Sequence, residues 1–593
     1  MLGTITDDHA GVVSAWLNRF ESALTTADAR ALEDLFLPES YWRDVLALTW
    51  RLETVCGPSQ IAEQLAINAR TATPRNFKID PREALPQEVT RVDKTVIEAF
   101  FRFETAAGHC EGIVRLAQQT DGDDQLKAWT VFTGLDELKG HAERRGTNRP
   151  TGQSHSRDFR GPNWLDQRNT AITYQDRDPT VLIVGGGQAG LATAARLTQL
   201  GVDTLIIDKH ERIGDNWRKR YHALTLHNQV QVNHLPYMPF PDTWPTYIPK
   251  DKLANWFEAY VDALELNYWT STELVGGTYD AKASCWNVIL RRPDSSERTL
   301  RPSHIVMATG VSGIANRPHI PTLDEFEGQL VHSSEYKDGE DWTGRKALII
   351  GTGNSGHDIA HDLTSSGAHV TLVQRNPTLV VNIEPSAQLP YALYDEGPSL
   401  EACDLITTSM PTPLVRRAHQ NYTRRARELD KTLLDRLEKI GFKLDFGEDD
   451  TGWQFKYLTR GGGYYFNVGC SDMLAEGKIN LLQYDQIESF SPSGAKLIDG
   501  RSLDADLIVL STGYLPQERL VEKLFGEQVA NKIGPIWGFG EGHELRNMYS
   551  RTTQPGLWFI AGSLAQCRIN SKALALQIKA CEEGIISKNQ ERQ

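Results

Sequence analysis

Long apolar runs, paired cysteines and an excess of basic residues are all missing from this chain of 593 residues. The longest uncharged stretch beside a predicted strand, residues 180–195, is glycine-rich and too short to span a bilayer. The formal net charge of −14 argues against nucleic-acid and anionic-membrane partners, because phosphate surfaces attract a basic face. The amino terminus has neither a basic start nor an apolar run, so we expect no secretory signal and a cytoplasmic location.

The seven cysteines are scattered, and none forms a CxxC or CxxxxC pair. An odd, unpaired set in a large chain indicates reduced thiols and predicts neither a disulfide framework nor a metal site. The cysteines are Cys56, Cys110, Cys285, Cys403, Cys470, Cys567 and Cys581.

The length suggests about three or four domains at roughly 150 residues each. Helical periodicity over residues 12–24, a short helix over 29–35 and strands at 96–104, 112–116 and 126–132 predict an α+β unit at residues 1–150. Residues 151–177 form a predicted linker rich in Gly, Pro and Arg. A strand, a glycine turn, a helix and a second strand then follow one another twice. We therefore predict an α/β fold with two Rossmann-like dinucleotide-binding domains after the α+β unit.

The first glycine loop reads TVLIVGGGQAG and follows an apolar strand at residues 181–184. Gly185 permits the tight turn, Gly187 lets a pyrophosphate approach the backbone, and Gly190 lets helix and strand pack closely. Asp208 ends the next strand, 23 residues after Gly185 (208 minus 185), where it can hold ribose hydroxyls. The alternative, a merely structural glycine turn, fits this combination of strand, helix and acid less well.

The second loop, KALIIGTGNSG, places Gly351, Gly353 and Gly356 in the same roles. The following strand ends at Arg375 and not at an acid, which suits a 2′-phosphate and predicts NADP(H) here and FAD at the first loop. The alternative is that Arg375 is a surface cation and the site takes NAD. Residues 304–310 and 506–514 are further apolar runs that end in Thr-Gly, typical of strands that return to a nucleotide-binding fold.

With these motifs in place, the chain resembles the class B flavin-containing monooxygenases, and more narrowly their YUCCA-like members. FEGQLVHSSEY (326–336) matches the family's identifying sequence, and GTGNSGHDIA matches its NADPH loop. IGDNW (213–217), LTLHNQVQVNHLPYMPFP (224–241) and GGGYYFNVG (461–469) resemble further family segments, the last two YUCCA-like. The resemblance covers residues 178–590 and implies FAD-binding parts at 178–325 and 516–593 around an NADPH-binding part at 326–515.

The chain departs from the family pattern at three positions. Tyr336 stands where Baeyer–Villiger enzymes carry tryptophan, and Asp215 stands where a second glycine is usual. His227 stands where animal-type members place asparagine beside the flavin. These departures argue against a simple transfer of the amine-oxygenating mechanism.

Residues 1–150 resemble, more weakly, the SnoaL-like and ketosteroid-isomerase-like cone fold. Trp42, Arg43, Asp44 and His109 are the candidates for catalysis there, and a structural cap or a dimer surface is the favoured alternative. A homodimer stays open on this basis.

The resemblance implies that NADPH reduces FAD and that the reduced flavin forms a peroxide with O2, which inserts one oxygen atom into a small organic substrate. A carbonyl compound such as a 2-oxo acid is slightly preferred over an amine or a sulfide. The predicted catalytic residues are His227, Asn228 and Asn354, although His227 could simply be packed and Asn354 could only brace its loop. The predicted cofactor-binding residues are Gly185, Gly187, Gln188, Gly190, Asp208, Lys209, Trp217, Thr309, Gly310, Gly351, Gly353, Asn354, Ser355, Gly356, Arg375 and Gly513.

Two other classes stay open. Two-dinucleotide disulfide reductases share the glycine loops but need a cysteine pair beside the flavin, which this chain lacks. A non-catalytic flavoprotein recruited by the first domain is disfavoured by the two intact glycine loops.

Overall fold

A computed structural model describes residues 7–82, 84–119, 125–150, 159–311, 313–395 and 397–589. Part of the predicted linker, residues 151–158, lies outside this set, and so do residues 590–593 of the last predicted domain. The described remainder of the linker contains helix α4 (Trp164–Ala171). A short 3-10 turn, η1 (Gly146–Asn148), lies just before the linker.

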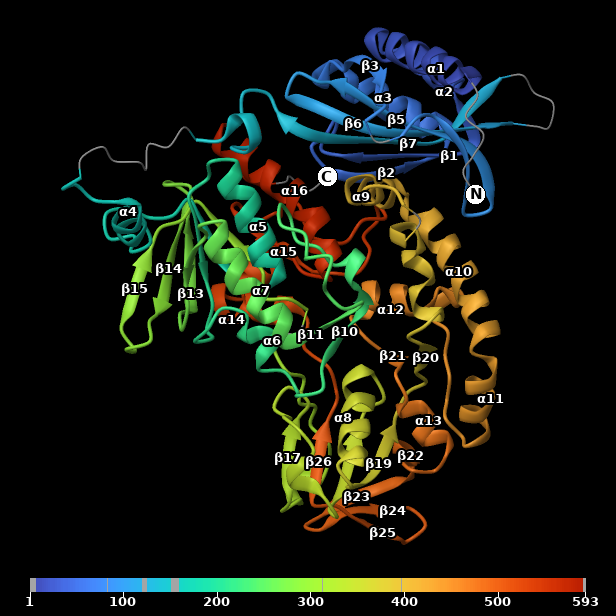
Figure 1. The fold of residues 1–593 in the computed structure, drawn as a ribbon, viewed down its shortest axis with the longest axis vertical. Helices are drawn as coiled ribbons and strands as arrows, with labels where there is room; N and C mark the ends of the chain where they lie inside the picture. Colours follow the sequence, from blue (N-terminus) through green and yellow to red (C-terminus); the bar gives the residue numbers. More distant parts are fainter. Residues whose placement is uncertain are drawn as a thin grey trace.

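The N-terminal unit is a seven-stranded sheet with helices against one of its faces (Figure 1). The strand order is β2-β1-β7-β6-β5-β3, and β4 pairs with β5. Aromatic side chains fill the space between the helices and the sheet: Trp16 stacks on Phe20 at 4.8 Å, and Phe77 stacks on Phe103 at 4.6 Å. The elements are α1 (Asp7–Thr26), α2 (Ala29–Glu33), β1 (Phe36–Val45), β2 (Leu52–Cys56), α3 (Pro58–Ala72), β3 (Arg75–Ile79), β4 (Gln87–Arg91), β5 (Lys94–Glu104), β6 (Gly108–Gln118) and β7 (Leu126–Leu138).

The first parallel sheet has the order β12-β9-β8-β16-β27, so its last strand comes from the far end of the chain. Its strands are almost completely buried, as expected for a parallel sheet covered by helices on its faces. The elements are β8 (Val181–Val184), α5 (Gln188–Gln199), β9 (Thr204–Ile207), α6 (Asp215–Arg218), β10 (Thr225–Gln229), β11 (Tyr247–Pro249), α7 (Lys250–Ala263), β12 (Asn267–Trp269), β16 (His304–Met307), β27 (Leu557–Phe559) and α16 (Leu564–Glu582), with the antiparallel β13 (Glu273–Asp280), β14 (Cys285–Arg291) and β15 (Glu297–Leu300) beside them.

The second parallel sheet repeats this topology, because β22-β19-β18-β26-β17 places the glycine-loop strand at the same point of the order. In each sheet, the chain runs from the glycine-loop strand to its neighbour on one side, whereas the neighbour on the other side comes from later in the chain. Each loop therefore lies at the point where ligands usually bind in such sheets. The elements are β17 (Gln329–His332), β18 (Lys346–Ile350), α8 (Asn354–Ser365), β19 (His369–Gln374), α13 (Cys470–Ala475), β22 (Asn480–Gln483) and β26 (Leu507–Leu510), and β23 (Ile487–Ser491), β24 (Gly494–Leu497) and β25 (Ser502–Asp504) form an antiparallel appendage.

A largely helical segment connects the second sheet to the N-terminal unit (Figure 1). Strands β20 and β21 pair in parallel within it. Its elements are β20 (Leu379–Asn382), the 3-10 helix η5 (Ser386–Asp395), α9 (Leu400–Ser409), α10 (Thr412–Leu429), α11 (Lys431–Lys439), α12 (Gly452–Arg460) and β21 (Tyr464–Asn467), and α14 (Gln517–Phe525) and α15 (Glu527–Ile533) follow the second sheet.

These elements confirm the predicted α/β class with two parallel nucleotide-binding sheets. The cone resemblance of the first unit and the domain limits stay predictions. Within the described residues, no helix is both long and apolar enough to span a bilayer.

Candidate active site

The first glycine loop joins β8 to α5 at the carboxyl edge of its sheet, with β9 and β16 on either side of β8. Gly185 has a φ of +108°, and a Cβ there would lie 2.6 Å from the Ala308 carbonyl oxygen. A Cβ on Gly190 would lie 2.0 Å from the Gly185 oxygen, so no side chain fits at the helix–strand contact. Asp208 accepts a hydrogen bond from Gly186 N at 2.8 Å, which ties the end of β9 to the loop.

The amino end of α5 suits a phosphate group. Gly187 caps it with no side-chain hydrogen bond. The first intrahelical bond runs from Leu191 N to Gly187 O, which leaves the N–H groups of residues 188–190 without partners in the helix. Thr309 follows β16, and its backbone N would lie 3.3 Å from a Cβ at Gly185. The buried Thr309 hydroxyl has no hydrogen-bond partner among the described residues, so the loop fits a dinucleotide.

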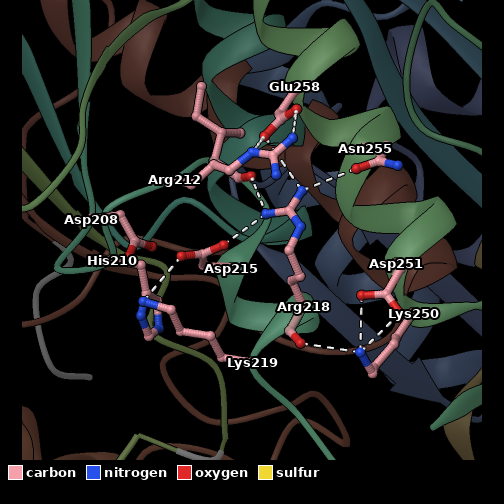
Figure 2. Close-up of polar contacts among 11 residues, drawn as sticks. Asp208, His210, Arg212, Asp215, Arg218, Lys219, Lys250, Asp251, Asn255 and Glu258 are labelled. Carbon is pink, nitrogen blue, oxygen red and sulfur yellow. Dashed lines mark hydrogen bonds and ion pairs between the residues drawn. The ribbon is translucent and has the colours of Figure 1, made fainter. Parts of the chain in front are cut away.

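The segment 213–217 lies beside this loop and is held by a network of ion pairs (Figure 2). Asp215 is buried and pairs with Arg218 at 2.7 Å and with Lys219 at 3.1 Å. Asp215, which stands where the family usually has a second glycine, is thus part of the ion-pair network that holds this segment. Trp217 Nε1 donates to Gln188 Oε1 at 3.3 Å, and Gln188 Nε2 donates to the Gly562 oxygen at 3.1 Å. Two predicted cofactor-binding residues therefore touch one another at the start of α5.

The second glycine loop repeats the geometry of the first. Gly351 has a φ of +119°, and a Cβ there would lie 2.3 Å from the Ser511 oxygen, just past β26. A Cβ on Gly353 would meet nothing closer than 3.8 Å, so the cap of α8 faces open space. Gly353 makes no side-chain cap, and Ser355 lies in the first turn of α8, whose N–H groups are available to a ligand. The buried Ser511 hydroxyl has no partner within the described residues, so this loop also fits a dinucleotide.

Arg375 follows β19 at the edge beside the second loop. Its side chain is exposed and forms no ion pair with any described residue. The preceding Gln374 is buried, and its side-chain amide bonds to the Lys443 backbone and to Gln483. Arg375 is thus free to meet an anion, as an adenosine 2′-phosphate requires.

His227 lies on β10 with its ring 5.1 Å from the ring of Phe466 on β21. Burial lowers the pKa of His227 to about 4, so the imidazole is neutral at physiological pH. Desolvation of the buried ring causes this shift, so the ring does not change charge near neutral pH. Asn354 Oδ1 accepts from Phe466 N at 3.0 Å, so Asn354 braces its loop against the strand that carries the ring facing His227.

Asn228 meets a group of four aromatic residues, here called the aromatic cluster: Tyr391, Trp453, Tyr464 and Phe466. Asn228 Nδ2 donates to the Tyr391 hydroxyl at 3.3 Å. Trp453 lies 4.9 Å from Phe466 and 6.1 Å from Tyr391, ring centre to ring centre. Trp453 also lines a pocket formed by β20, α10 and α12. Sequence reasoning missed Tyr391 and Trp453, since neither lies in a glycine loop.

The remaining predicted residues fall around the two loops. The Gly310 oxygen accepts from Gln517 Nε2 at 3.1 Å, and the Gly513 oxygen accepts from Asn316 N at 2.9 Å and contacts His332 Nε2 at 3.0 Å. His332 is the buried histidine of the 326–336 motif, so that motif supports the turn after β26. Lys209 is exposed, and no contact joins it to the other predicted residues.

The candidates in the N-terminal unit separate into two groups. Trp42 Nε1 donates to Thr133 Oγ1 at 2.9 Å, and Thr133 Oγ1 donates to Asp44 at 2.6 Å inside the unit. Burial raises the pKa of Asp44 to about 6, although its carboxylate also holds the following turn through Leu48 N and Thr49 N. Arg43 instead leaves the unit and pairs with Glu544 at 2.8 Å, while His109 is exposed. The four residues do not form one site.

Comparison with known proteins decides the family. A model of the family described as pyridine nucleotide-disulphide oxidoreductase matches residues 182–393. The probable indole-3-pyruvate monooxygenase YUCCA10 of Arabidopsis thaliana is 30% identical over 339 residues, 57% of this chain and 82% of that protein. The indole-3-pyruvate monooxygenase YUCCA1 of Oryza sativa subsp. japonica is 31% identical over 341 residues, 57% of this chain and 77% of that protein. The chain belongs to the flavin-containing monooxygenase family.

Solved structures agree at the level of the fold. An open crystal structure of cyclohexanone monooxygenase matches 69% of this chain and 88% of its own, with a TM-score of 0.50 and 16% identity. A cyclohexanone monooxygenase mutant from Rhodococcus sp. Phi1, bound to NADP+, matches 69% of this chain with the same TM-score.

As a flavin-containing monooxygenase, the protein uses FAD, NADPH and O2 to oxygenate a small organic substrate. All seven cysteines lie in the described part of the chain, and all are free. No cysteine pair therefore stands ready for disulfide reductase chemistry. Tyr336, at the end of the 326–336 motif, is buried and donates to Asp362 Oδ2 at 2.6 Å, which ties the motif to α8.

Proposed function

We propose that this monooxygenase inserts oxygen into an aromatic 2-oxo acid held between His227, Asn228 and the aromatic cluster. The observation that carries the proposal is the aromatic cluster beside a neutral histidine, since a pocket wall of tilted and edge-on aromatic rings suits a flat aromatic substituent. Support also comes from the relatives described as indole-3-pyruvate monooxygenases, whose named substrate is an aromatic 2-oxo acid.

In this proposal FAD lies against residues 185–190 and NADPH against residues 351–356, with Arg375 at the 2′-phosphate. The corresponding parts are 178–325 with 516–593 for FAD and 326–515 for NADPH. Support comes from the two uncapped helix ends and from the unpartnered hydroxyls of Thr309 and Ser511. When bound, the two cofactors supply the hydride and the reactivity toward O2.

The chain's own residues have three tasks in the proposed pocket. Neutral His227 offers one donor and one acceptor without placing a charge beside the reacting carbonyl. The Asn228 amide, held by Tyr391, orients a polar group of the substrate. Trp453 and Phe466 exclude water, which strengthens the remaining polar contacts.

The proposed reaction places one oxygen atom between the two carbonyl carbons and releases the terminal carbon as CO2. One 2-oxo acid, one O2, one NADPH and one proton give the shortened carboxylic acid, CO2, NADP+ and water. In the alternative reaction an amine or a sulfide takes the oxygen atom and no carbon is lost.

The test is a panel of an aromatic 2-oxo acid, an aliphatic 2-oxo acid, an amine and a sulfide, each with NADPH and ¹⁸O2. We expect one labelled oxygen in the shortened acid and one CO2 per NADPH, with the aromatic compound the best substrate. Labelled N-oxide or sulfoxide as the main product would overturn the carbonyl assignment. NADPH consumption without any labelled product would overturn the oxygenation itself.

We also infer a cytoplasmic location and leave a homodimer as the open alternative to a monomer. The scattered free cysteines support a reducing compartment. Fractionation of the native host and light scattering of the purified protein test the two points.

A further inference from the structure

The outer face of the N-terminal sheet is covered by the helical segment of the same chain. Phe100, Ile113 and Phe132 pack there against Ala402 and Ile406 of α9, all of them buried. Leu414 of α10 packs in the same way against a second apolar group of the sheet. Figure 1 shows α9 lying directly beneath this unit.

Two arginines of the N-terminal unit hold the carboxyl end of α9. Arg115 is completely buried, pairs with Glu98 at 2.7 Å and donates to Ser409 Oγ at 2.7 Å. Arg43 donates to the Thr408 carbonyl oxygen. Cations at the carboxyl end of a helix also interact favourably with its dipole.

The same helix is tied to the interior through Asp404. Arg568 of α16 pairs with both Asp404 oxygens, at 2.7 and 2.8 Å, and its side chain is only 4% exposed. The Tyr394 hydroxyl of η5 donates to Asp404 at 2.8 Å. Arg568 also donates to the backbone oxygens of Val232 and His234, just past β10. Through Tyr394 and Arg568, the Asp404 carboxylate of α9 is thus connected to η5 and to the segment after β10.

The 3-10 helix η5 lies against the residues of the proposed pocket. Gln388 Nε2 donates to the His227 oxygen at 3.0 Å, and Tyr391 accepts from Asn228. An unbroken chain of contacts therefore runs from the N-terminal sheet through α9, Asp404 and η5 to His227 and Asn228. Oxygenation is sensitive to such geometry, since a misplacement of about 1 Å can cost ~100-fold in rate.

We propose that the N-terminal unit positions the wall of the oxygenation pocket by holding α9, so that Ile406, Ser409 and Tyr394 are positioning residues. This inference rests on the proposed placing of the pocket at His227 and the aromatic cluster.

The test compares Ile406→Ala with Ile61→Ala in the full-length holoenzyme. Ile406 is 5% exposed and faces the sheet from α9, whereas Ile61 is completely buried on α3 within the N-terminal unit. Both truncations create a cavity and lower the melting temperature. We expect only Ile406→Ala to raise KM for the substrate, and the share of NADPH lost as hydrogen peroxide, by about 3- to 10-fold. Flavin reduction by NADPH keeps its rate in both variants.

If Ile406→Ala fails to fold, two milder substitutions test the same chain of contacts. Ser409→Ala removes the Arg115 contact, and Tyr394→Phe removes the Asp404 contact. The double variant is expected to raise KM by less than the product of the single effects, because both changes act on one path. Additive effects, or equal KM and coupling in Ile406→Ala and Ile61→Ala, would overturn the positioning role.

Trp453→Ala separates this inference from the function on which it rests. If Trp453→Ala leaves KM, coupling and product unchanged, the proposed pocket itself is wrong. If Trp453→Ala changes them while Ile406→Ala and Ser409→Ala do not, only the positioning role is wrong.

Discussion

Gly187 is the N-cap of α5 in the first glycine loop, and a Cβ there would lie 2.9 Å from Asn216 Nδ2. We expect Gly187→Val to purify with little or no FAD, because the added methyl groups would crowd the cap of α5, where the pyrophosphate would approach the backbone. The measurement is flavin absorbance per protein after gel filtration. Gly11→Val is the control, since a Cβ at Gly11 meets nothing within 4 Å. Full flavin content in Gly187→Val would contradict the assignment of FAD to this loop.

Arg375 decides the coenzyme in our proposal. Its guanidinium is exposed and forms no ion pair within the described ranges, so it can bind a 2′-phosphate by charge-assisted hydrogen bonds. Such a contact contributes about 1.5–3 kcal/mol, so Arg375→Ala should raise KM for NADPH by roughly 10- to 100-fold. KM for NADH should hardly change. Steady-state oxygen consumption with each coenzyme measures this, and Arg425→Ala on α10 is the control. Equal effects on both coenzymes would refute the assignment.

His227 is expected to act as a neutral hydrogen-bonding group. Since burial lowers its pKa to about 4, its charge does not change between pH 6 and 8. His227→Asn should change the product yield per NADPH, and by the same factor at pH 6 and at pH 8. Product and hydrogen peroxide per NADPH, measured at both pH values, provide the check. A factor that depends on pH in this range would show that the ring titrates, and an unchanged yield would remove His227 from the mechanism.

Helix α8 carries an acid-sensitive histidine in its first turns. His357 is completely buried, stacks on Tyr465 at 3.9 Å, and burial lowers its pKa to about 4. The unfolded chain takes up a proton near pH 6.5 and the folded chain does not. The stability contributed by the neutral His357 is therefore fully present above pH 6.5 and is lost as the pH falls toward 4.

Replacing His357 with phenylalanine should weaken this acid sensitivity while keeping the ring stack. The wild type should lose roughly 1.6 kcal/mol more than His357→Phe between pH 6.5 and pH 5, since a full pKa unit corresponds to about 1.36 kcal/mol and the unfolded histidine is already half protonated at pH 6.5. Burial raises the pKa of Asp358 to about 6, so the pH dependence of stability from this carboxyl is opposite in sign to that from His357. Asp358 titrates in both proteins and therefore does not affect the difference between them. Urea unfolding at pH 8, 6.5 and 5 measures the difference, with exposed His109→Phe as the control. Parallel curves for wild type and His357→Phe would contradict the prediction.

Among the elements, those of the glycine loops were the most predictable. Strand β8 falls at the predicted residues and β9 ends directly before Asp208, because a short apolar run bounded by glycine and an acid has few other structures. Strands β1 to β4 and helix α3 were not predicted, since their apolar residues are fewer and alternate less regularly. The charged residues 412–439 form helices α10 and α11. Arg417 of α10 pairs with Glu39, and Asn421 donates to Asp93, both in the N-terminal unit.

At the scale of the whole molecule, the N-terminal unit and the first parallel sheet share one apolar core, and we expect them to unfold together. A single hydrophobic cluster runs from α1 through the first parallel sheet to α16. Arg43 and Glu544, whose side chains are 13% and 16% exposed, bridge the N-terminal unit and the C-terminal part. Shared apolar contacts of this kind make separate unfolding of the units unfavourable.

Glu544→Gln should therefore lower the stability of the entire chain. Losing the ionic partner of Arg43 is expected to cost about 1.5–3 kcal/mol, because the contact is a charge-assisted one with two hydrogen bonds. Scanning calorimetry should show a single transition in the wild type and a lower midpoint in Glu544→Gln. Glu541→Gln, in the same loop but exposed, should leave the midpoint in place. An unchanged midpoint in Glu544→Gln, or two separate wild-type transitions, would contradict the cooperative picture.

The amino-acid sequence alone determined the two nucleotide-binding sheets, the two cofactors and the monooxygenase family. The residues that mark each nucleotide-binding loop lie within about 25 residues of one another, so their spacing can be recognised directly in the sequence. They are Gly185, Gly190 and Asp208 for the first loop and Arg375 for the second. Only the tertiary structure placed Asn354 against Phe466, Tyr391 against Asn228 and the N-terminal sheet against α9. Those contacts join residues more than 100 positions apart, from Asn354 to Phe466, for example (466 minus 354 is 112). Such partners are selected by packing of buried surfaces, which no local pattern of residues encodes.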